Sequence, residues 1–147
     1  MHRASHDYMR KRTDMSHLYK KSPQRAHPRR LSLAIVIDCM HTYEQEHCLI
    51  CYFDEYQKLL HARKTTSGMR DNVDISLRYL VCEALVFNAH SMLMTHNHPG
   101  GDTRPSPADI AQTRAIARAL APVHIAIGDH IIIGRSDYFS FRENGLL

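Results

Sequence analysis

The apolar residues of this chain lie in short separate runs, and this spacing limits the folds that the chain can adopt. The longest unbroken run is residues 48–53, far shorter than the roughly 20 apolar residues that cross a membrane as a helix. The runs alternate between strand-like and helix-like spacing, which is typical of a sheet covered by helices. With 147 residues the chain is long enough for one domain with a real core. We therefore expect a single domain, an α/β or α+β sandwich of one sheet and flanking helices.

The first thirty residues differ from the rest in charge. Residues 1–30 hold nine of the 19 Lys and Arg residues and two of the 15 acidic ones, whereas residues 31–147 carry a small acidic excess. A basic segment with so few aliphatic side chains cannot bury enough apolar surface to offset its ordering entropy. We predict that residues 1–30 form a disordered tail. A solvated extension is the favoured interpretation, and a non-specific contact with nucleic acid is the alternative.

Hydrophobic periodicity predicts the elements that follow this tail. Helices are expected at 31–43, 75–89 and 107–120, and strands at 47–53, 56–62, 91–95, 124–127, 130–133 and 138–141. Asp54 and Glu55 form the turn of a hairpin, and residues 99–105 form a loop with two glycines and two prolines.

Two histidines follow the strand predicted at 91–95. In extended backbone, residues two apart point to the same face, so His96 and His98 project together from the end of this strand. Paired neutral imidazoles are suited to zinc. By itself the pair is also compatible with a solvent-facing strand end, because the chain contains 12 histidines.

A carboxylate in the next helix strengthens the metal hypothesis. Ser106 is the expected N-cap of the helix at 107–120, with Pro107 at its first position and Asp109 at its third. This spacing is a variant of the capping box, which is a purely structural interpretation. Capping does not exclude ligation, however. If the loop folds back so that the first helical turn faces His96 and His98, two histidines and one carboxylate meet, the ligand set of a catalytic zinc site.

A hydrolytic zinc site also needs a group that transfers protons. Three glutamates are candidates, namely Glu46, Glu55 and Glu83. Glu46 is preferred because it stands at the start of a buried strand, on the same face as Cys48, where burial can raise the pKa of a carboxyl group. A solvated strand terminus is the alternative interpretation of Glu46.

The order of these motifs resembles the JAMM (MPN+) metalloprotease signature, which consists of a Glu, a distant His-x-His and then Ser-x-x-Asp. The sequence is most similar to the RadC family of JAB-domain proteins. The residues that carry the resemblance, spread over about 44–147, are Glu46, the His96-Asn97-His98-Pro99 loop, Pro105-Ser106, Asp109, Asp129-His130-Ile131-Ile132-Ile133-Gly134, and the closing segments 138–141 and 143–147. Gly100 stands where the family loop usually has Ser.

This resemblance implies both a fold and a reaction. The fold is a three-layer, cytidine deaminase-like sandwich of a mixed sheet and flanking helices, formed by residues 31–147. His96, His98 and Asp109 are implied as zinc ligands and Glu46 as general acid and base. Ser106 is implied as a donor to the oxyanion. The implied reaction is hydrolysis of a peptide or isopeptide bond in a peptide or protein substrate.

Two other functions remain as alternatives. One is a non-catalytic RadC-like module that binds a protein or DNA partner, with DNA repair suggested by the family name alone. The other is a metal-dependent nuclease, which the acidic excess of residues 31–147 disfavours.

The N-terminal residues lack the apolar core of a secretory signal, so we expect a cytoplasmic protein with reduced thiols. Cys48 and Cys51 are interpreted as core residues rather than a zinc knuckle, because residues three apart in a strand face opposite sides. His130 is interpreted as a partly buried histidine outside the ligand set.

Overall fold

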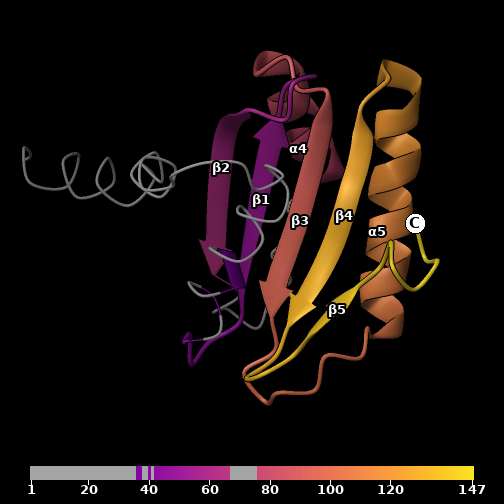
Figure 1. Cartoon of the computed structure of the whole chain (residues 1–147). Coiled ribbons are helices and arrows are strands. Elements are labelled where there is room, and N and C mark those ends of the chain that lie inside the picture. Colours follow the sequence, from indigo (N-terminus) through magenta and orange to yellow (C-terminus); the bar gives the residue numbers. More distant parts are fainter. Residues whose placement is uncertain (1–35, 38–39, 41, 67–75) are drawn as a thin grey trace, which may run out of the picture.

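A single mixed sheet organises the protein (Figure 1). The computed structural model describes residues 36–37, 40, 42–66 and 76–147. Five strands lie in the order β2-β1-β3-β4-β5. Their bounds are β1 His47–Phe53, β2 Leu59–Thr66, β3 Ser91–Asn97, β4 Ala126–Ile133 and β5 Tyr138–Ser140, and the helices are α4 Leu77–Val86, α5 Pro107–Leu120 and the short 3-10 helix Ala121–Val123. The predicted α/β architecture is confirmed.

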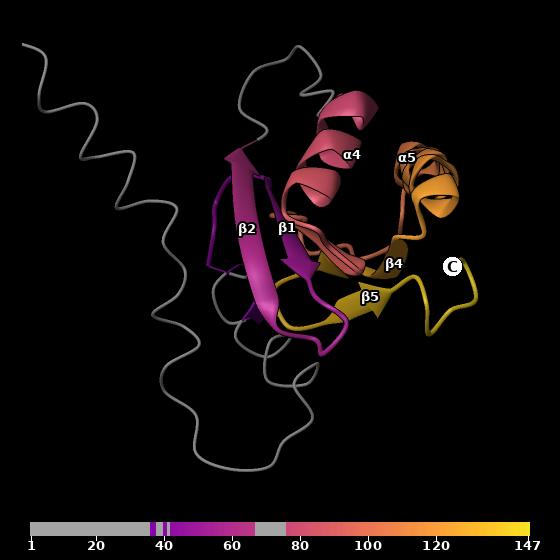
Figure 2. The ribbon, with the colours of Figure 1, turned by 90° about the horizontal axis from the view of Figure 1, so that it is seen from above.

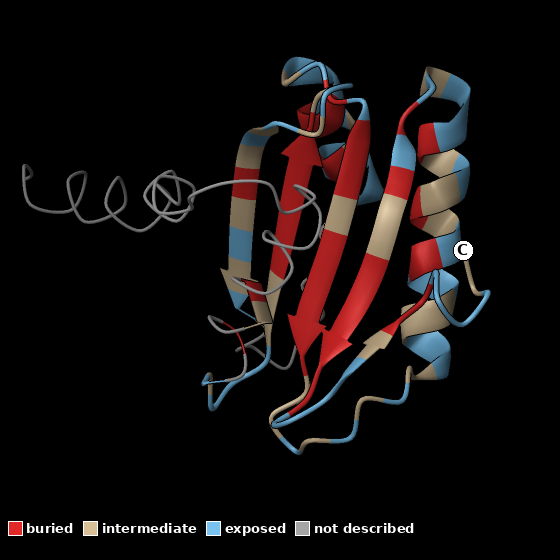
Figure 3. Cartoon of the chain, in the orientation of Figure 1, coloured by how far each residue is buried: buried red, intermediate tan, exposed pale blue. Residues whose placement is uncertain are grey.

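The sheet buries both of its faces. Helices α4 and α5 lie side by side on one face, as Figure 2 shows from above. There Ile50 of β1 and Met92 of β3 belong to one apolar cluster with Leu80 of α4 and Ile116 of α5. A second cluster on the opposite face includes Leu49 of β1 and residues 36 and 40. The central strands are accordingly the most buried part of the sheet (Figure 3).

The hairpin of β1 and β2 differs in detail from the prediction. Asp54 organises the turn, since its carboxylate accepts hydrogen bonds from the backbone N–H groups of Tyr56 and Lys58. The turn therefore extends to Lys58, and β2 begins at Leu59 rather than at residue 56. The strand also ends later than residue 62, because Thr65 and Thr66 pair with Cys48 and His47. Their branched side chains suit the pleated sheet.

Two of the predicted closing strands are a single strand. The prediction of separate strands at 124–127 and 130–133 was wrong, because β4 runs without interruption through Gly128 and Asp129. Its parallel pairing with β3 shifts register there, so that Met92 opposes Ile127 and Leu93 opposes Asp129. Gly128 is the extra residue of this bulge. The sequence pattern concealed the bulge because Gly-Asp is also a common turn dipeptide.

The remaining predicted elements agree apart from their ends. Helix α4 is shorter than the predicted 75–89, and Asn88, just beyond it, adopts a left-handed conformation with φ of 51°. Of the helix predicted at 31–43, residues 36, 37 and 40 are helical, while 31–35, 38–39 and 41 lie outside the described residues. The tail predicted at 1–30 also lies outside them. Across the described ranges, no helix combines the length and apolar character needed to cross a membrane.

The structure predicts unequal reactivity of the cysteines. Burial raises the pKa of Cys48 to about 12, with a further contribution from the charge of Glu46, and burial raises the pKa of Cys51 to about 12. Cys82 is exposed on α4. In a Cys39→Ser background, a thiol reagent at pH 8 should modify the exposed Cys82 rapidly, the half-buried Cys48 more slowly and the buried Cys51 only upon unfolding, as mass spectrometry of timed samples can show. Rapid labelling of Cys51 in the native protein would contradict its burial.

Candidate metal centre

The carboxyl end of β3 places two histidines on the same side. His96 lies within the strand and is buried, whereas His98 follows its last residue. The backbone N–H of His98 donates to the carbonyl oxygen of Ile133 at 2.8 Å, so the pairing with β4 continues one residue beyond the strand. Both rings are directed to the face that α5 covers, and their centroids are 4.8 Å apart.

The first turn of α5 brings the carboxylate. Ser106 is the N-cap, and a complete capping box links it to Asp109. Oδ2 of Asp109 accepts hydrogen bonds from the backbone N–H of Ser106 at 2.7 Å and from its hydroxyl at 2.6 Å. The other oxygen, Oδ1, lies 3.5 Å from Nε2 of His96. The cap therefore holds one carboxylate oxygen and leaves the second directed at the histidines.

The structure thus brings the three predicted ligands together. Nε2 of His96 and Nε2 of His98 are 3.0 Å apart, and the ligand atoms of His96, His98 and Asp109 all lie within 4.8 Å of one another. Two neutral imidazoles and a carboxylate are a donor set that binds divalent metal ions, zinc among them.

The surroundings of His96 favour its neutral form, and those of Asp109 favour its charged form. Burial lowers the pKa of His96 to about 4, against an opposing influence of the Asp109 carboxylate. Burial alone would raise the pKa of Asp109, but the hydrogen bonds from Ser106 and the neighbouring His96 bring it below its usual value. A neutral imidazole and an ionised carboxylate are the protonation states that metal ligation requires.

A tight loop positions His98. Its Nδ1 lies 2.6 Å from the carbonyl oxygen of Asp102, so the ring is held from its outer side. The loop packs closely on Gly134, where an added Cβ would lie 2.7 Å from the carbonyl oxygen of Gly101. At Gly100, by contrast, a Cβ would meet nothing within 4 Å. A serine at this position is therefore sterically compatible with this loop.

A further histidine contacts the cluster from β4. Nε2 of His130 lies 2.9 Å from Nδ1 of His96, and Nδ1 of His130 lies 2.6 Å from the hydroxyl of Thr113. Burial lowers the pKa of His130 to about 3, and the neighbouring His96 acts in the same direction. Sequence reasoning left His130 out and did not single out Thr113. The available signal was the position of Thr113, one helical turn after Asp109 on the same face of α5.

Glu46 lies immediately before β1, beside the cluster in the register of the sheet. Cys48 is the cross-strand partner of His96, so continuing the antiparallel register by two residues brings Glu46 opposite His98. The buried side chain of Asn97 ties this segment to β3, since it accepts from the N–H of His47 at 2.7 Å and donates to the carbonyl oxygen of Gln45 at 3.0 Å. Glu46 is exposed, whereas the sequence argument placed it beside a buried face.

The other two glutamates are placed elsewhere. Glu83 accepts hydrogen bonds from Arg63 and from the hydroxyl of Tyr52, so its carboxylate is committed to the packing of α4 on the sheet. Glu55 is exposed in the hairpin turn beyond Phe53, at the opposite end of β1 from Glu46. Of the three candidates, Glu46 is the one adjacent to the histidine pair in the sheet register.

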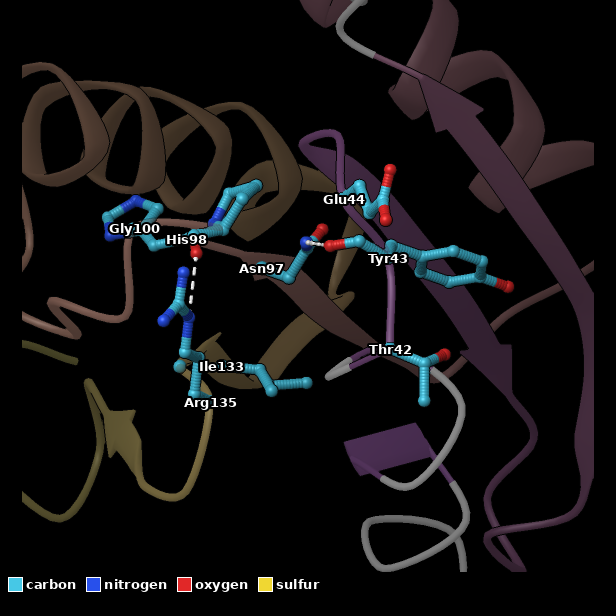
Figure 4. A pocket seen from close by; sticks show the side chains of 10 residues that line it. Thr42, Tyr43, Glu44, Asn97, His98, Gly100, Ile133 and Arg135 are labelled. Atoms are coloured by element: carbon cyan, nitrogen blue, oxygen red, sulfur yellow. Dashed lines mark hydrogen bonds between the residues drawn. The ribbon is translucent and has the colours of Figure 1, made fainter.

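A cleft of about 510 Å³ opens beside His98 (Figure 4). It is lined by Thr42, Tyr43, Glu44, Asn97, His98, Pro99, Gly100, Ile133, Gly134 and Arg135. Arg135 crosses the loop and donates from Nε to the carbonyl oxygen of Pro99 at 3.3 Å. The cluster of His96, His98 and Asp109 therefore borders an open, polar space on its His98 side.

The sequence of the whole region matches a known family. A family model described as the RadC-like JAB domain matches residues 27–146. The chain belongs to the RadC-like JAB domain family. This match spans the sheet, both helices and every residue of the candidate metal centre.

Three curated relatives are similar to this chain in sequence. The chain is 36% identical over 104 residues to UPF0758 protein YfjY of Escherichia coli (strain K12), which covers 71% of this chain and 65% of the relative. It is 38% identical over 102 residues to UPF0758 protein BAV2405 of Bordetella avium (strain 197N), covering 69% and 45%. It is 35% identical over 108 residues to UPF0758 protein YkfG of Escherichia coli (strain K12), covering 74% and 68%. The chain thus spans less than two thirds of the first two relatives, and none of the three names states an activity.

The capping box of α5 predicts a measurable contribution to stability. Replacing Ser106 with Ala removes the hydroxyl that accepts from the N–H of Asp109 and donates to its carboxylate. Loss of a serine N-cap costs about 1 kcal/mol in the free energy of unfolding, which urea denaturation of the metal-free protein can measure. Ser106→Thr retains a capping hydroxyl and should lose less. Equal stability of Ser106→Ala and the wild type would mean that this cap contributes nothing.

Proposed function

We propose that this protein is a zinc-dependent hydrolase of the JAMM type that cleaves a peptide or isopeptide bond. The observation that carries the proposal is the convergence of His96, His98 and Asp109 within 4.8 Å at the end of β3. Membership of the RadC-like JAB family supports it.

Two of the three separations between ligand atoms are close to those of a zinc site. Zinc–nitrogen bonds of about 2.0–2.1 Å in a tetrahedral site place two ligand atoms about 3.3 Å apart. The observed separations are 3.0 Å between the two Nε2 atoms and 3.5 Å between Nε2 of His96 and Oδ1 of Asp109. Three protein ligands leave the fourth tetrahedral position open, which distinguishes catalytic from structural zinc sites.

The protonation of His98 also favours a cation. A carbonyl oxygen only accepts hydrogen bonds, so Nδ1 of His98 must donate to the carbonyl oxygen of Asp102. When this ring is neutral, its Nε2 is a bare lone pair directed at His96. A lone pair of this kind, held near a carboxylate, is prepared for a metal ion.

Glu46 and Ser106 have separate roles in the proposed reaction. When bound, zinc supplies Lewis acidity that lowers the pKa of a water molecule to about 7. In the proposed mechanism Glu46 accepts a proton from the attacking water and delivers it to the leaving amine. The hydroxyl of Ser106 donates to the oxygen of the reacting carbonyl group. Because this hydroxyl donates to Asp109 in the structure, the role requires it to turn towards the substrate.

The alternative is a RadC-like module that binds a protein or DNA partner without catalysis. The complete ligand set favours the enzyme, because a binding module has no need of three converging metal ligands. Contact of residues 1–30 with nucleic acid remains a separate proposal based on their charge. It is tested by comparing DNA binding of the full chain with that of a variant lacking these residues.

The zinc site predicts stoichiometric metal binding. Metal-free protein titrated with zinc sulfate should bind one zinc ion per chain, as measured by competition with a chromogenic chelator. His96→Ala and Asp109→Ala should each weaken zinc binding at least a hundredfold, because each removes a ligand atom. His90→Ala is the matched control, since His90 is exposed at the opposite end of β3. Unchanged zinc affinity in either ligand variant would refute the site.

If Glu46 transfers the proton, replacing it should slow cleavage without changing zinc affinity. Glu46→Gln should retain wild-type zinc affinity while losing at least about a hundredfold in cleavage rate, the lower range for a general acid–base residue. A suitable substrate pool is a library of quenched fluorescent peptides that includes lysine isopeptide linkages. Glu55→Gln is the control, because that glutamate is exposed in the distant hairpin turn. Full activity of Glu46→Gln would show that another group transfers the proton. Zinc binding without cleavage by the wild type would favour the binding module.

A further inference from the structure

We propose that Thr113 and His130 form a hydrogen-bond relay that holds His96 in the tautomer whose Nε2 is unprotonated and directed at the metal site. The relay deepens the proposed function, since its consequence is zinc affinity. Its members are positioning residues that act through His96. The direction of each hydrogen bond in the relay is set by which atom can donate and which can only accept.

The relay begins with the hydroxyl of Thr113, which is fully buried on α5. Oγ1 lies 2.6 Å from the carbonyl oxygen of Asp109 and 2.6 Å from Nδ1 of His130. A carbonyl oxygen has no hydrogen to give, so the single hydroxyl hydrogen lies on the contact with Asp109. Towards His130 the hydroxyl oxygen can then only accept.

The second step sets the tautomer of His130. Because Thr113 accepts, Nδ1 of His130 carries a hydrogen. The ring is 2% exposed and stacks on Phe141, with centroids 4.5 Å apart. An apolar, buried site of this kind disfavours a second, charging proton. Nε2 of His130 is therefore a lone pair, and it faces His96.

The third step sets the tautomer of His96, the proposed metal ligand. Nδ1 of His96 lies 2.9 Å from Nε2 of His130, and since that nitrogen only accepts, Nδ1 of His96 carries the hydrogen. Nε2 of His96 is then unprotonated, and Nε2 of His98 is unprotonated whenever that ring is neutral. Two lone pairs 3.0 Å apart beside a carboxylate oxygen repel one another unless a cation lies between them. The relay thus removes the proton that would otherwise compete with zinc.

The bulge in β4 makes the relay possible. In a regular strand, Ile127 and His130 would point to opposite faces, because they are three residues apart. The extra residue Gly128 places them on the same face, opposite Met92 and Met94. His130 therefore points towards α5 and not into the other core.

The test compares two substitutions of one hydroxyl. Thr113→Val is nearly isosteric and removes the acceptor, whereas Thr113→Ser retains it. With zinc sulfate as the probe, Thr113→Val should bind zinc about tenfold more weakly or worse, the usual loss when a partner of a ligating histidine is removed. Thr113→Ser should restore wild-type affinity to within about twofold. Wild-type zinc affinity in Thr113→Val overturns the relay.

A spectroscopic measurement decides the relay independently of metal and of any folding defect. Two-bond 1H–15N correlation spectra of the histidine-labelled wild-type protein report which ring nitrogen carries the proton. His130 and His96 should both carry a proton at Nδ1 and none at Nε2, with or without zinc. A proton on Nε2 of His130 overturns the relay. If the wild type binds no zinc the proposed function fails, yet these spectra still decide the relay.

Discussion

The parallel pairing of β3 with β4 is the constraint on which the candidate site depends. Parallel neighbours cannot be joined by a tight turn, so the chain must cross back over the sheet before β4 begins. Helix α5 is that crossover, and the loop of residues 98–106 leads from the end of β3 to its first turn. The first turn of the helix therefore lies over the carboxyl end of β3, the edge at which open α/β sheets bind ligands. His96 and His98 come from the strand, and Asp109 comes from the helix that the topology requires.

The two carboxylate oxygens of Asp109, in the first turn of α5, have different roles: one caps the helix and the other faces the histidines. Oδ2 of Asp109 completes the capping box with Ser106, which satisfies backbone groups that a helix N-terminus leaves free. Oδ1 faces Nε2 of His96. The structural and the ligating interpretations of Asp109 are therefore compatible, and the cap improves the ligand by holding its direction. The same turn continues to Thr113, whose hydroxyl binds the backbone of Asp109 and contacts His130.

Prediction from sequence succeeded where short-range rules apply. The strand period of two placed His96 and His98 on one face, and the N-cap pattern placed Asp109 in the first turn of a helix. It failed where a local pattern had two structural outcomes. Gly128-Asp129 suggested a turn but forms a bulge within one strand. Glu46 was expected beside a buried face, yet it is exposed and is held near β3 through the contacts of Asn97 with its neighbours.

The sequence by itself determined the element types, the α/β class and the identity of the three residues that converge. These follow from periodicity, capping and side-chain chemistry, which act over a few residues along the chain. Tertiary structure alone decided that Oδ1 of Asp109 faces the histidines and that His130 contacts His96. It also paired Cys48, two residues after Glu46, with His96. Each of these depends on strand register, a bulge or a crossover, and such long-range pairings are set by the packing of the whole sheet rather than by neighbouring residues.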